Sequence, residues 1–442
     1  MVVLCALLPL VIAAASATAL PVNTNVVNGS PFGEIADVVS QIDASRLQST
    51  VETLVSFGTR NTFSGDTGIV AAGQWIHDTF ASFGAPLDVQ FDRFDAVVNG
   101  RDVSIVNVLA TLPGYDPTDT RVVLLSGHYD SRASNTTDGE SAAPGANDDA
   151  TGTAVTIEAA RVLVANAATA QLRLPCTVVF ATFAAEEQGL IGSAHVAERY
   201  AAQGVNLVAM LNNDIVGGAL FSSETGLRDN VHVRLFSETG SAQDGLEDDS
   251  PQRQLARYVK DVADLYVDQL EAVLVYRRDR YLRGGDQTSF TALGFNAIRI
   301  TEMNENHVWQ HQDVREVDGV QYGDLPEHVD FGYVKKVAQM NVAAAVAIAL
   351  APGSPASAEL NMAQLSNQAH IQWTYPPASE GRDRVAGFVV LRRQTDASQW
   401  EWASRLFVNT TEAVLPYSVD NFLFAVQAVD SEGHASIAIP VR

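Results

Sequence analysis

Five side chains of the types that bind metal ions are spread along the middle of the sequence. In chain order they are His128, Asp148, Glu187, Asp214 and His311. A further carboxylate, Glu186, stands directly before the third of them. Two imidazoles and three carboxylates can hold two metal cations of hard to borderline character, and the extra carboxylate can take a proton from a metal-bound water. These residue types therefore indicate a metal-dependent hydrolase.

The chain is long enough for a large domain and a smaller one. It has 442 residues, whereas a single hydrophobic core usually stops growing at roughly 250–300. We expect a signal peptide at 1–19, an N-terminal segment and candidate pro-region at 20–41, and a catalytic domain at 42–350. A linker at 351–357, marked by Pro352, Gly353 and Pro355, would lead to a small β module at 358–442.

Residues 1–19 have the features of a secretory signal. The apolar run Leu4 to Ala15 is followed by the small residues Ala17-Thr18-Ala19, as signal peptidase requires. A membrane anchor is the alternative, but a span needs ~20 apolar residues. We expect a secreted protein, and the glycosylation acceptors at Asn28, Asn135 and Asn409 agree with secretion.

Charge and cysteine content exclude several partners. With 28 basic and 52 acidic residues the formal net charge is −24, so we expect neither nucleic acid nor an anionic membrane surface as a partner, because both need a basic face. After removal of a signal peptide containing Cys5, Cys176 is the remaining cysteine, which rules out an internal disulfide. The sequence does not set an oligomeric state.

Short apolar runs alternate with amphipathic helical patterns after the first 100 residues. Two helices come first, one capped by Ser45 and followed by Gly58, the other containing Trp75 to Phe83. The expected strands are 103–109, 122–126, 177–183, 207–211 and 297–300. The expected later helices are 153–164, 191–200, 255–266 and 334–350. This alternation predicts an α/β domain with a mostly parallel sheet covered by helices.

The candidate ligands follow strands of this sheet. His128 comes after the strand 122–126, Glu187 after 177–183 and Asp214 after 207–211. Ligands of parallel sheets bind at the carboxyl ends of the strands. Taken singly, an Asp before a helix is usually an N-cap and a Glu pair is usually solvated surface. Two carboxylates directly after an apolar strand are costly to bury without a cation, which favours a metal site.

Four stretches resemble the di-zinc exopeptidases of the bacterial leucyl aminopeptidase type. They are Gly127-His128-Tyr129-Asp130-Ser131, Pro144 to Gly152 (PGANDDATG), Ala185 to Ser193 (AEEQGLIGS), and Asn213-Asp214. Their order and spacing match over roughly residues 42–350. The resemblance implies the fold of a zinc exopeptidase, two Zn²⁺ per chain and peptide or protein substrates.

The resemblance also implies a role for each matching residue. Asp148 would bridge the two zinc ions, His128 and Asp214 would complete one site, and Glu187 with a late histidine would complete the other. Glu186 would act as the general base, and Asp130 would hold His128.

The late histidine departs from the family pattern. Relatives often place a ligand histidine four residues before an aspartate, but Trp309 stands four residues before Asp313. Either His307 or His311 would then be the ligand, and the surroundings of His311 are more similar to those of relatives. We therefore predict His311.

A segment around Asp286 resembles the stretch that lines the substrate pocket of relatives. Relatives often carry histidine where this chain has Gln287. Asp286 could contact the amine of a substrate or simply cap the following helix. We assign it to the substrate site.

Beyond residue 358, short strands with turn signals every dozen or so residues predict a β-sandwich. Trp373, the stretch Gly387 to Arg392, and Ala428 to Gly433 resemble a fibronectin type III module. Packing or adhesion would be its role.

Together these features predict a secreted zinc aminopeptidase in which a metal-activated water attacks N-terminal peptide bonds. Two alternatives remain open. One is a glutaminyl-cyclase-like or other metal-dependent amide hydrolase on the same scaffold. The other is a catalytically silent binding protein of this fold. The sequence does not set the preference for an N-terminal residue.

Overall fold

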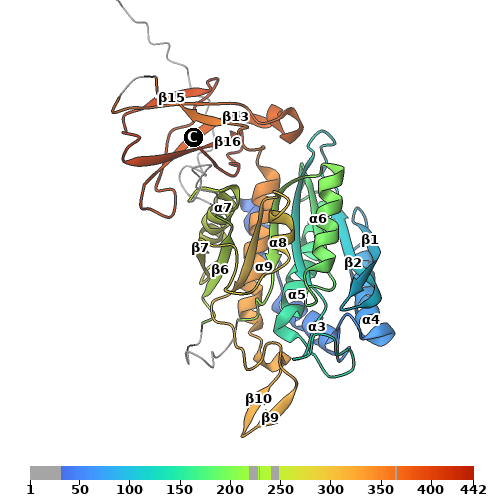
Figure 1. Cartoon of the computed structure of the whole chain (residues 1–442). Helices are drawn as coiled ribbons and strands as arrows, with labels where there is room; N and C mark the ends of the chain where they lie inside the picture. Colours follow the sequence, from blue (N-terminus) through green and yellow to red (C-terminus); the bar gives the residue numbers. More distant parts are fainter. Residues whose placement is uncertain (1–30, 219–226, 228, 240–247, 364–365) are drawn as a thin grey trace, which may run out of the picture.

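A computed structural model describes residues 31–218, 227, 229–239, 248–363 and 366–442. The predicted signal peptide and Asn28 lie outside these residues. The large domain is built on one eight-stranded sheet (Figure 1). In spatial order its strands are β1 (Asp88–Val98), β2 (Arg101–Leu112), β4 (Thr177–Phe183), β3 (Arg121–His128), β5 (Asn206–Asn213), β8 (Ala297–Glu302), β6 (His232–Ser237) and β7 (Glu271–Val275).

The centre of the sheet is parallel and its sides are mixed. Strand β3 pairs in parallel with β4 and β5, and β5 pairs in parallel with β8. The pairs β1–β2, β2–β4 and β6–β8 are antiparallel. The predicted α/β class and the five predicted strands are confirmed. Strands β1, β6 and β7 were not predicted, and all three lie toward the two sides of the sheet.

Helices cover both faces because side chains alternate along each buried strand. In β4, Val178 and Phe180 join the cluster of buried residues that includes helices α3 (Ala44–Val55), α5 (Thr151–Ala168), α7 (Pro251–Tyr266) and α9 (Phe331–Leu350). Val179 and Phe183, which point to the opposite face of β4, join the cluster that includes α6 (Ile191–Gln203) and α8 (Gln287–Thr291). Burying one such side chain contributes about 1.5–3 kcal/mol.

The first long helix starts at a different cap from the predicted one. The N-cap of α3 is Asp43, whose side chain accepts a hydrogen bond from the Ser45 N–H. Ser45 lies inside the helix, so its prediction as the cap was wrong. An aspartate two residues earlier could reach the free amides of the first turn, and it competes well with serine for this position. Helix α4 (Ile69–Ser82) ends just before Gly84, which has φ +79°.

Helix α2 (Gly33–Ser40) lies within the segment 20–41 that was expected to precede the catalytic domain. Its Ile35, Val38 and Val39 are buried in the same core as α9. The last part of this segment therefore belongs to the packed core of the large domain. The predicted domain boundaries and the pro-region stay predictions.

Helix α9 is long and apolar enough to cross a bilayer by length and composition alone. In the fold, however, 78% of its most apolar window is buried inside the protein. Helices α2, α3, α5 and α7 all pack against it. Its apolar character is accounted for by this central position in the core.

The C-terminal part forms an antiparallel β-sandwich, as predicted. One sheet has the order β11 (Ala358–Leu360), β12 (Ala369–Trp373), β15 (Glu412–Leu415). The other has the order β14 (Trp402–Ala403), β13 (Val385–Gln394), β16 (Phe422–Asp430), β17 (Ile439–Pro440). Trp373 is buried between the sheets, with ring centroids 5.6 Å from Phe388 and 5.9 Å from Phe407.

The sandwich sits at the end of the large domain where the central strands begin (Figure 1). Just before β3, the Thr120 N–H donates to the Ser379 carbonyl, and Asn206 at the start of β5 donates to Glu380. Buried ion pairs tie the two parts together, among them Arg393 with Asp249 at 2.9 Å. The hairpin of β9 (Arg315–Val317) and β10 (Val320–Tyr322) projects from the opposite end (Figure 1).

Candidate metal centre

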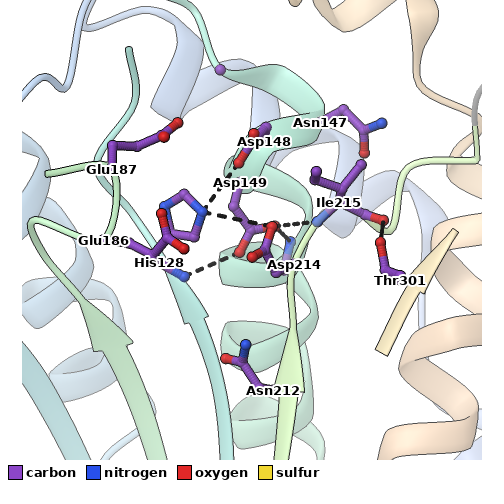
Figure 2. A network of polar contacts seen from close by, with 12 residues as sticks. His128, Asn147, Asp148, Asp149, Glu186, Glu187, Asn212, Asp214, Ile215 and Thr301 are labelled. Carbon is purple, nitrogen blue, oxygen red and sulfur yellow. Dashed lines mark hydrogen bonds and ion pairs between the residues drawn. The ribbon is translucent and has the colours of Figure 1, made fainter. Parts of the chain in front are cut away.

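Four of the five predicted ligands lie close together at the carboxyl end of the central strands: His128, Asp148, Glu187 and Asp214 (Figure 2). His128 is the last residue of β3, Glu187 follows β4 and Asp214 follows β5. Asp148 lies in the segment Ala146–Ala150 that leads into α5, and its own backbone is not helical (φ −111°, ψ 94°). A Cβ on Gly152 would lie 2.4 Å from both Asp149 Oδ2 and the Asn213 carbonyl. Glycine at this position therefore lets α5 approach the ends of the strands.

These residues form two groups with ligand geometry. His128, Asp148 and Asp214 make up the first, and Asp148, Glu187 and His311 the second, each with its donor atoms within 4.8 Å of one another. In the first group, His128 Nε2 lies 3.1 Å from Asp148 Oδ1 and 3.7 Å from Asp214 Oδ1. In the second, His311 Nε2 lies 2.9 Å from Asp148 Oδ2 and 3.1 Å from Glu187 Oε1.

The spacing suits zinc. Donor atoms bound at about 2.0–2.1 Å to one tetrahedral ion lie roughly 3.3 Å apart, close to the separations within both groups. His128 Nε2 and Glu187 Oε1 are buried, and although each lies 3.1 Å from another ligand atom, neither makes a hydrogen bond of good geometry with a described residue. Buried polar atoms normally make one. A cation in each group would satisfy them. Asp148 offers one carboxylate oxygen to each group, so it can bridge the two ions.

Of the two late histidines, the structure brings His311 to the cluster. His311 has a left-handed backbone with φ +57° and approaches both Asp148 and Glu187. His307 is exposed and belongs to neither group.

The pKa shifts in the cluster also favour bound cations. Although burial opposes the charged imidazole, Glu186, Asp130, Asp148 and Asp214 raise the pKa of His128 well above its ordinary value. Burial raises the pKa of Glu186 and of Glu187. Too many carboxylates share one buried space for the available positive charge, and metal ions would supply what is missing.

Asp130 links His128 to the Glu186-Glu187 pair. His128 Nδ1 lies 3.2 Å from the backbone carbonyl oxygen of Asp130 and 3.5 Å from Asp130 Oδ1. If Nδ1 carries the proton, Nε2 keeps its lone pair for a metal. The Asp130 carboxylate accepts hydrogen bonds from the backbone N–H groups of Glu186 and Glu187, at 3.1 and 3.2 Å. Both glutamates are therefore held beside the imidazole (Figure 2).

Two further carboxylates hold the backbone around the cluster. Asp149 accepts the N–H groups of His128, Gly152 and Ile215 at 3.0, 2.9 and 3.2 Å, so it ties β3 to α5 and to the end of β5. Asp324 accepts the N–H of Asp148 at 2.7 Å. Asp149 follows the pattern expected of a helix-start residue, whereas nothing in the local sequence pointed to Asp324.

Two residues that contact the ligands were missed from the sequence. Arg299 is fully buried in β8 and its Nη1 contacts Asp214 Oδ2. Gln310 donates from Nε2 to Asp148 Oδ2 at 2.8 Å. Arg299 occupies a core position of a strand, where an arginine is rare unless paired. An arginine inside the predicted apolar strand 297–300 could have drawn attention to Arg299, but its partner could not be named before the fold was known.

Asp286 lies next to the cluster as a buried carboxylate without partners. Neither of its oxygens has a hydrogen bond to a described residue. Burial raises its pKa to about 7, against the opposing effects of His128 and of the nearby Ser193 hydroxyl, which makes no hydrogen bond of good geometry with it. Such a carboxylate normally has a charged or donating partner, so Asp286 is suited to pair with a cationic or hydrogen-bonding group of a ligand.

Comparison with known proteins agrees with this site. Residues 107–331 match peptidase family M28. A probable zinc metalloprotease of Pyricularia oryzae is 39% identical over 434 residues, which cover 92% of this chain and 84% of that protein. A probable zinc metalloprotease of Leptosphaeria maculans is 38% identical over 436 residues, covering 93% and 98%.

Solved structures show the same fold. The LapA aminopeptidase of Legionella pneumophila superposes with a TM-score of 0.53 at 20% identity, covering 72% of this chain and 75% of LapA. The aminopeptidase of Aneurinibacillus sp. strain AM-1 gives 0.52 at 17% identity, covering 71% and 96%. The predicted zinc exopeptidase fold is thereby confirmed. From the matched family, its close relatives and a ligand cluster suited to zinc, we conclude that the chain belongs to peptidase family M28 and is a zinc metalloprotease.

Proposed function

We propose that this protein is a secreted aminopeptidase that uses two zinc ions to remove N-terminal residues from peptides. One observation supports two metal ions rather than one. The two oxygens of Asp148 face different imidazoles, Oδ1 toward His128 at 3.1 Å and Oδ2 toward His311 at 2.9 Å. A carboxylate placed in this way serves two ions at once.

Zinc held by these ligands would polarise the scissile carbonyl and lower the pKa of a bound water. Glu186 is the general base in this proposal. Its carboxyl group is buried, and burial raises its pKa well above the ordinary value. A carboxylate with a raised pKa is a better proton acceptor near neutral pH. It accepts the proton of the attacking water and delivers it to the nitrogen of the leaving amine.

The other residues position these groups. Asp130 fixes the backbone of Glu186 and lies against His128. Asp324 and Asp149 hold the turn that carries Asp148. Because these hydrogen bonds hold the backbone of the ligand segments, the ligands need little rearrangement before the reaction.

Asp286 supports an aminopeptidase over an endopeptidase. Its fully buried carboxylate has no hydrogen-bond partner among the described residues, and a free N-terminal ammonium group would provide one. An acetylated N-terminus carries no positive charge and would leave Asp286 unsatisfied. The structural relatives LapA and the Aneurinibacillus enzyme are described as aminopeptidases, which agrees with this choice.

Secretion is supported by the predicted signal peptide and by exposed glycosylation acceptors. Asn135 and Asn409 both lie on the surface. We also propose that the C-terminal sandwich is a fibronectin type III-like module. Its first, second and fifth strands share one sheet and its other strands form the second, a division typical of that fold.

Metal content and product analysis test the proposal. The purified protein should bind about two zinc ions per chain and release the first residue of a free peptide but not of its acetylated form. Release of pyroglutamyl product from a glutaminyl peptide, without hydrolysis, would indicate a cyclase instead. A protein that holds no zinc and cleaves neither peptide would contradict the mechanism.

A further inference from the structure

A group of arginines lies on one side of the metal centre. The segment Arg277 to Arg283 reads RRDRYLR, an unusual density of positive charge in a chain with a net charge of −24. Arg234, Arg280 and Arg283 all contact the single carboxylate of Glu305, at 2.9, 2.8 and 2.6 Å. One negative charge is thus shared by three guanidinium groups.

Other carboxylates nearby do not balance this charge. Asp279 pairs with Arg280 at 3.0 Å, and Asp214 pairs with Arg299. Asp214 is also a predicted metal ligand, so a bound cation would share its charge. The arginines therefore gather on one side of a site whose other sides are lined by carboxylates.

Arg283 extends from this group toward the ligands. Its Nη1 donates to Gln310 Oε1 at 3.1 Å, and Gln310 Nε2 in turn donates to Asp148 Oδ2 at 2.8 Å. The side chain of Arg283 keeps 26% of its surface exposed, and the preceding Tyr281 and Leu282 are largely exposed. A guanidinium group that still reaches solvent thus lies one side chain away from the bridging carboxylate.

Arg132 approaches the same group of ligands from a different element. It follows β3, and its Nε lies 3.7 Å from Glu187 Oε2, too far for a hydrogen bond. This Nε is buried and has no hydrogen-bond partner among the described residues, while 20% of the side chain is exposed. Arg132 therefore has one unused donor, Nε, beside Glu187, and part of its side chain reaches solvent.

We propose that Arg132 and Arg283 bind a carboxylate of the peptide substrate, so that the enzyme prefers peptides with a negative charge close to the scissile bond. This inference rests on the proposed peptidase function and names its substrate class. Guanidinium groups bind carboxylates through paired hydrogen bonds. The carboxylate could be the C-terminus of a dipeptide or an acidic side chain next to the cleaved bond, and the two sources can be separated by experiment.

Four substrates of the zinc-loaded enzyme distinguish these sources. They are leucyl-leucine, leucyl-leucine amide, leucyl-glutamate amide and leucyl-glutamine amide. We expect a charged substrate to exceed its neutral partner in kcat/KM by about tenfold to a hundredfold. Preference for leucyl-leucine over its amide would assign the C-terminal carboxylate. Preference for leucyl-glutamate amide over leucyl-glutamine amide would assign the side chain. Equal values in both pairs would overturn the proposal.

Arginine variants test the residues. In Arg132→Gln and Arg283→Gln the charged-to-neutral ratio of kcat/KM should fall toward one, mainly through KM, and lysine at either position should restore part of it. Arg46→Gln, at an exposed position of α3, is the matched control and should leave the ratio unchanged. If Arg132→Gln weakens zinc binding without changing the ratio, Arg132 only supports Glu187 and its part in the proposal is wrong. An unchanged ratio in Arg283→Gln would contradict the part of Arg283.

A binding measurement separates this inference from the proposed function. In zinc-loaded Glu186→Gln protein, calorimetry would compare the Kd of leucyl-leucine with that of its amide, and of leucyl-glutamate amide with that of leucyl-glutamine amide. Tighter binding of the charged partner, lost in Arg283→Gln, would support the carboxylate site even if the wild type cleaves none of these peptides. Equal Kd values alongside normal peptide cleavage by the wild type would overturn the site and leave the peptidase function standing.

Discussion

Arg299 and Asp214 form an ion pair at the base of the metal centre, with the arginine fully buried. The Nη1 of Arg299 contacts Asp214 Oδ2, which leaves Oδ1 directed toward His128 at 3.7 Å. Although burial opposes the charged carboxylate, Arg299 and His128 lower the pKa of Asp214 to about 2. Arg299 thus keeps Asp214 ionised and selects the oxygen that it presents to a metal.

Replacing Arg299 should therefore weaken zinc binding. We expect Arg299→Gln to lose about 10–100-fold in zinc affinity, as is usual when a group that orients a ligand is removed. Competition with a chelator would measure this change. Arg299→Lys keeps the charge and should lose less. An unchanged affinity in Arg299→Gln would show that Asp214 does not need this partner.

The two late histidines form a natural pair for comparison. His311→Ala removes a donor 3.1 Å from Glu187 Oε1, so it should lower peptide turnover at least about 100-fold and release about one zinc ion per chain. His307→Ala, at an exposed position outside the cluster, should keep both. Metal analysis and turnover of a leucyl substrate would decide, and the opposite result would reassign the ligand to His307.

Glu186→Gln should separate metal binding from chemistry. The amide has nearly the same shape but cannot accept a proton, so turnover should fall by about 10²–10⁴-fold. Zinc content should stay near that of the wild type, because Glu186 belongs to neither ligand group. Substantial activity in this variant would exclude Glu186 as the base.

His434 makes the packing of the sandwich sensitive to pH. Its Nδ1 lies 2.9 Å from Asp430 Oδ2 and its Nε2 lies 3.0 Å from Glu34 Oε1 of helix α2. Burial opposes the charged imidazole, but these carboxylates raise the pKa of His434 above its ordinary value. A raised folded-state pKa means that the stabilisation is complete below the unfolded pKa of about 6.5 and is lost as the pH rises through the folded pKa.

His434→Gln should therefore destabilise the protein most in acid. We expect a loss of about 1.5 kcal/mol in unfolding free energy at pH 5, shrinking as the pH rises toward 9. Denaturation curves across this range would measure it. His370→Gln, in strand β12, serves as the control. A difference that grows with pH would contradict the assigned ion pairs.

The junction between the two domains depends on Asp249. Its carboxylate pairs with Arg257 at 2.6 Å and with Arg393 of the sandwich at 2.9 Å. Asp249→Asn would leave two buried guanidinium groups without a counter-charge and should cost about 3–5 kcal/mol of unfolding free energy. Asp248→Asn is the matched control. Asp248 also pairs with an arginine, but its side chain is 70% exposed, so its loss should cost at most about 1 kcal/mol.

Much of the fold followed from local patterns. Apolar runs such as 177–183 predicted the central strands because those strands are buried on both faces. Strand β1 was missed because its side chains are only partly buried and Arg93 interrupts the alternation of Val89, Phe91 and Phe94. The strands β6 and β7 lie at the other side of the sheet, where the apolar signal is also weaker.

The residues of the site likewise fall into those that the sequence could place and those that it could not. Residues at the carboxyl ends of strands, such as His128 and Asp214, could be placed from the order of the elements. Gln310, Asp324 and Arg299 could not, because each acts through a contact more than 80 positions away along the chain. Only the folded chain brings such side chains to their partners.

The sandwich packs against the end of the large domain where the central strands start, and the ligands lie at the other end, where those strands finish. A larger structure that bound the sandwich would therefore contact the protein at the end opposite to the metal ligands.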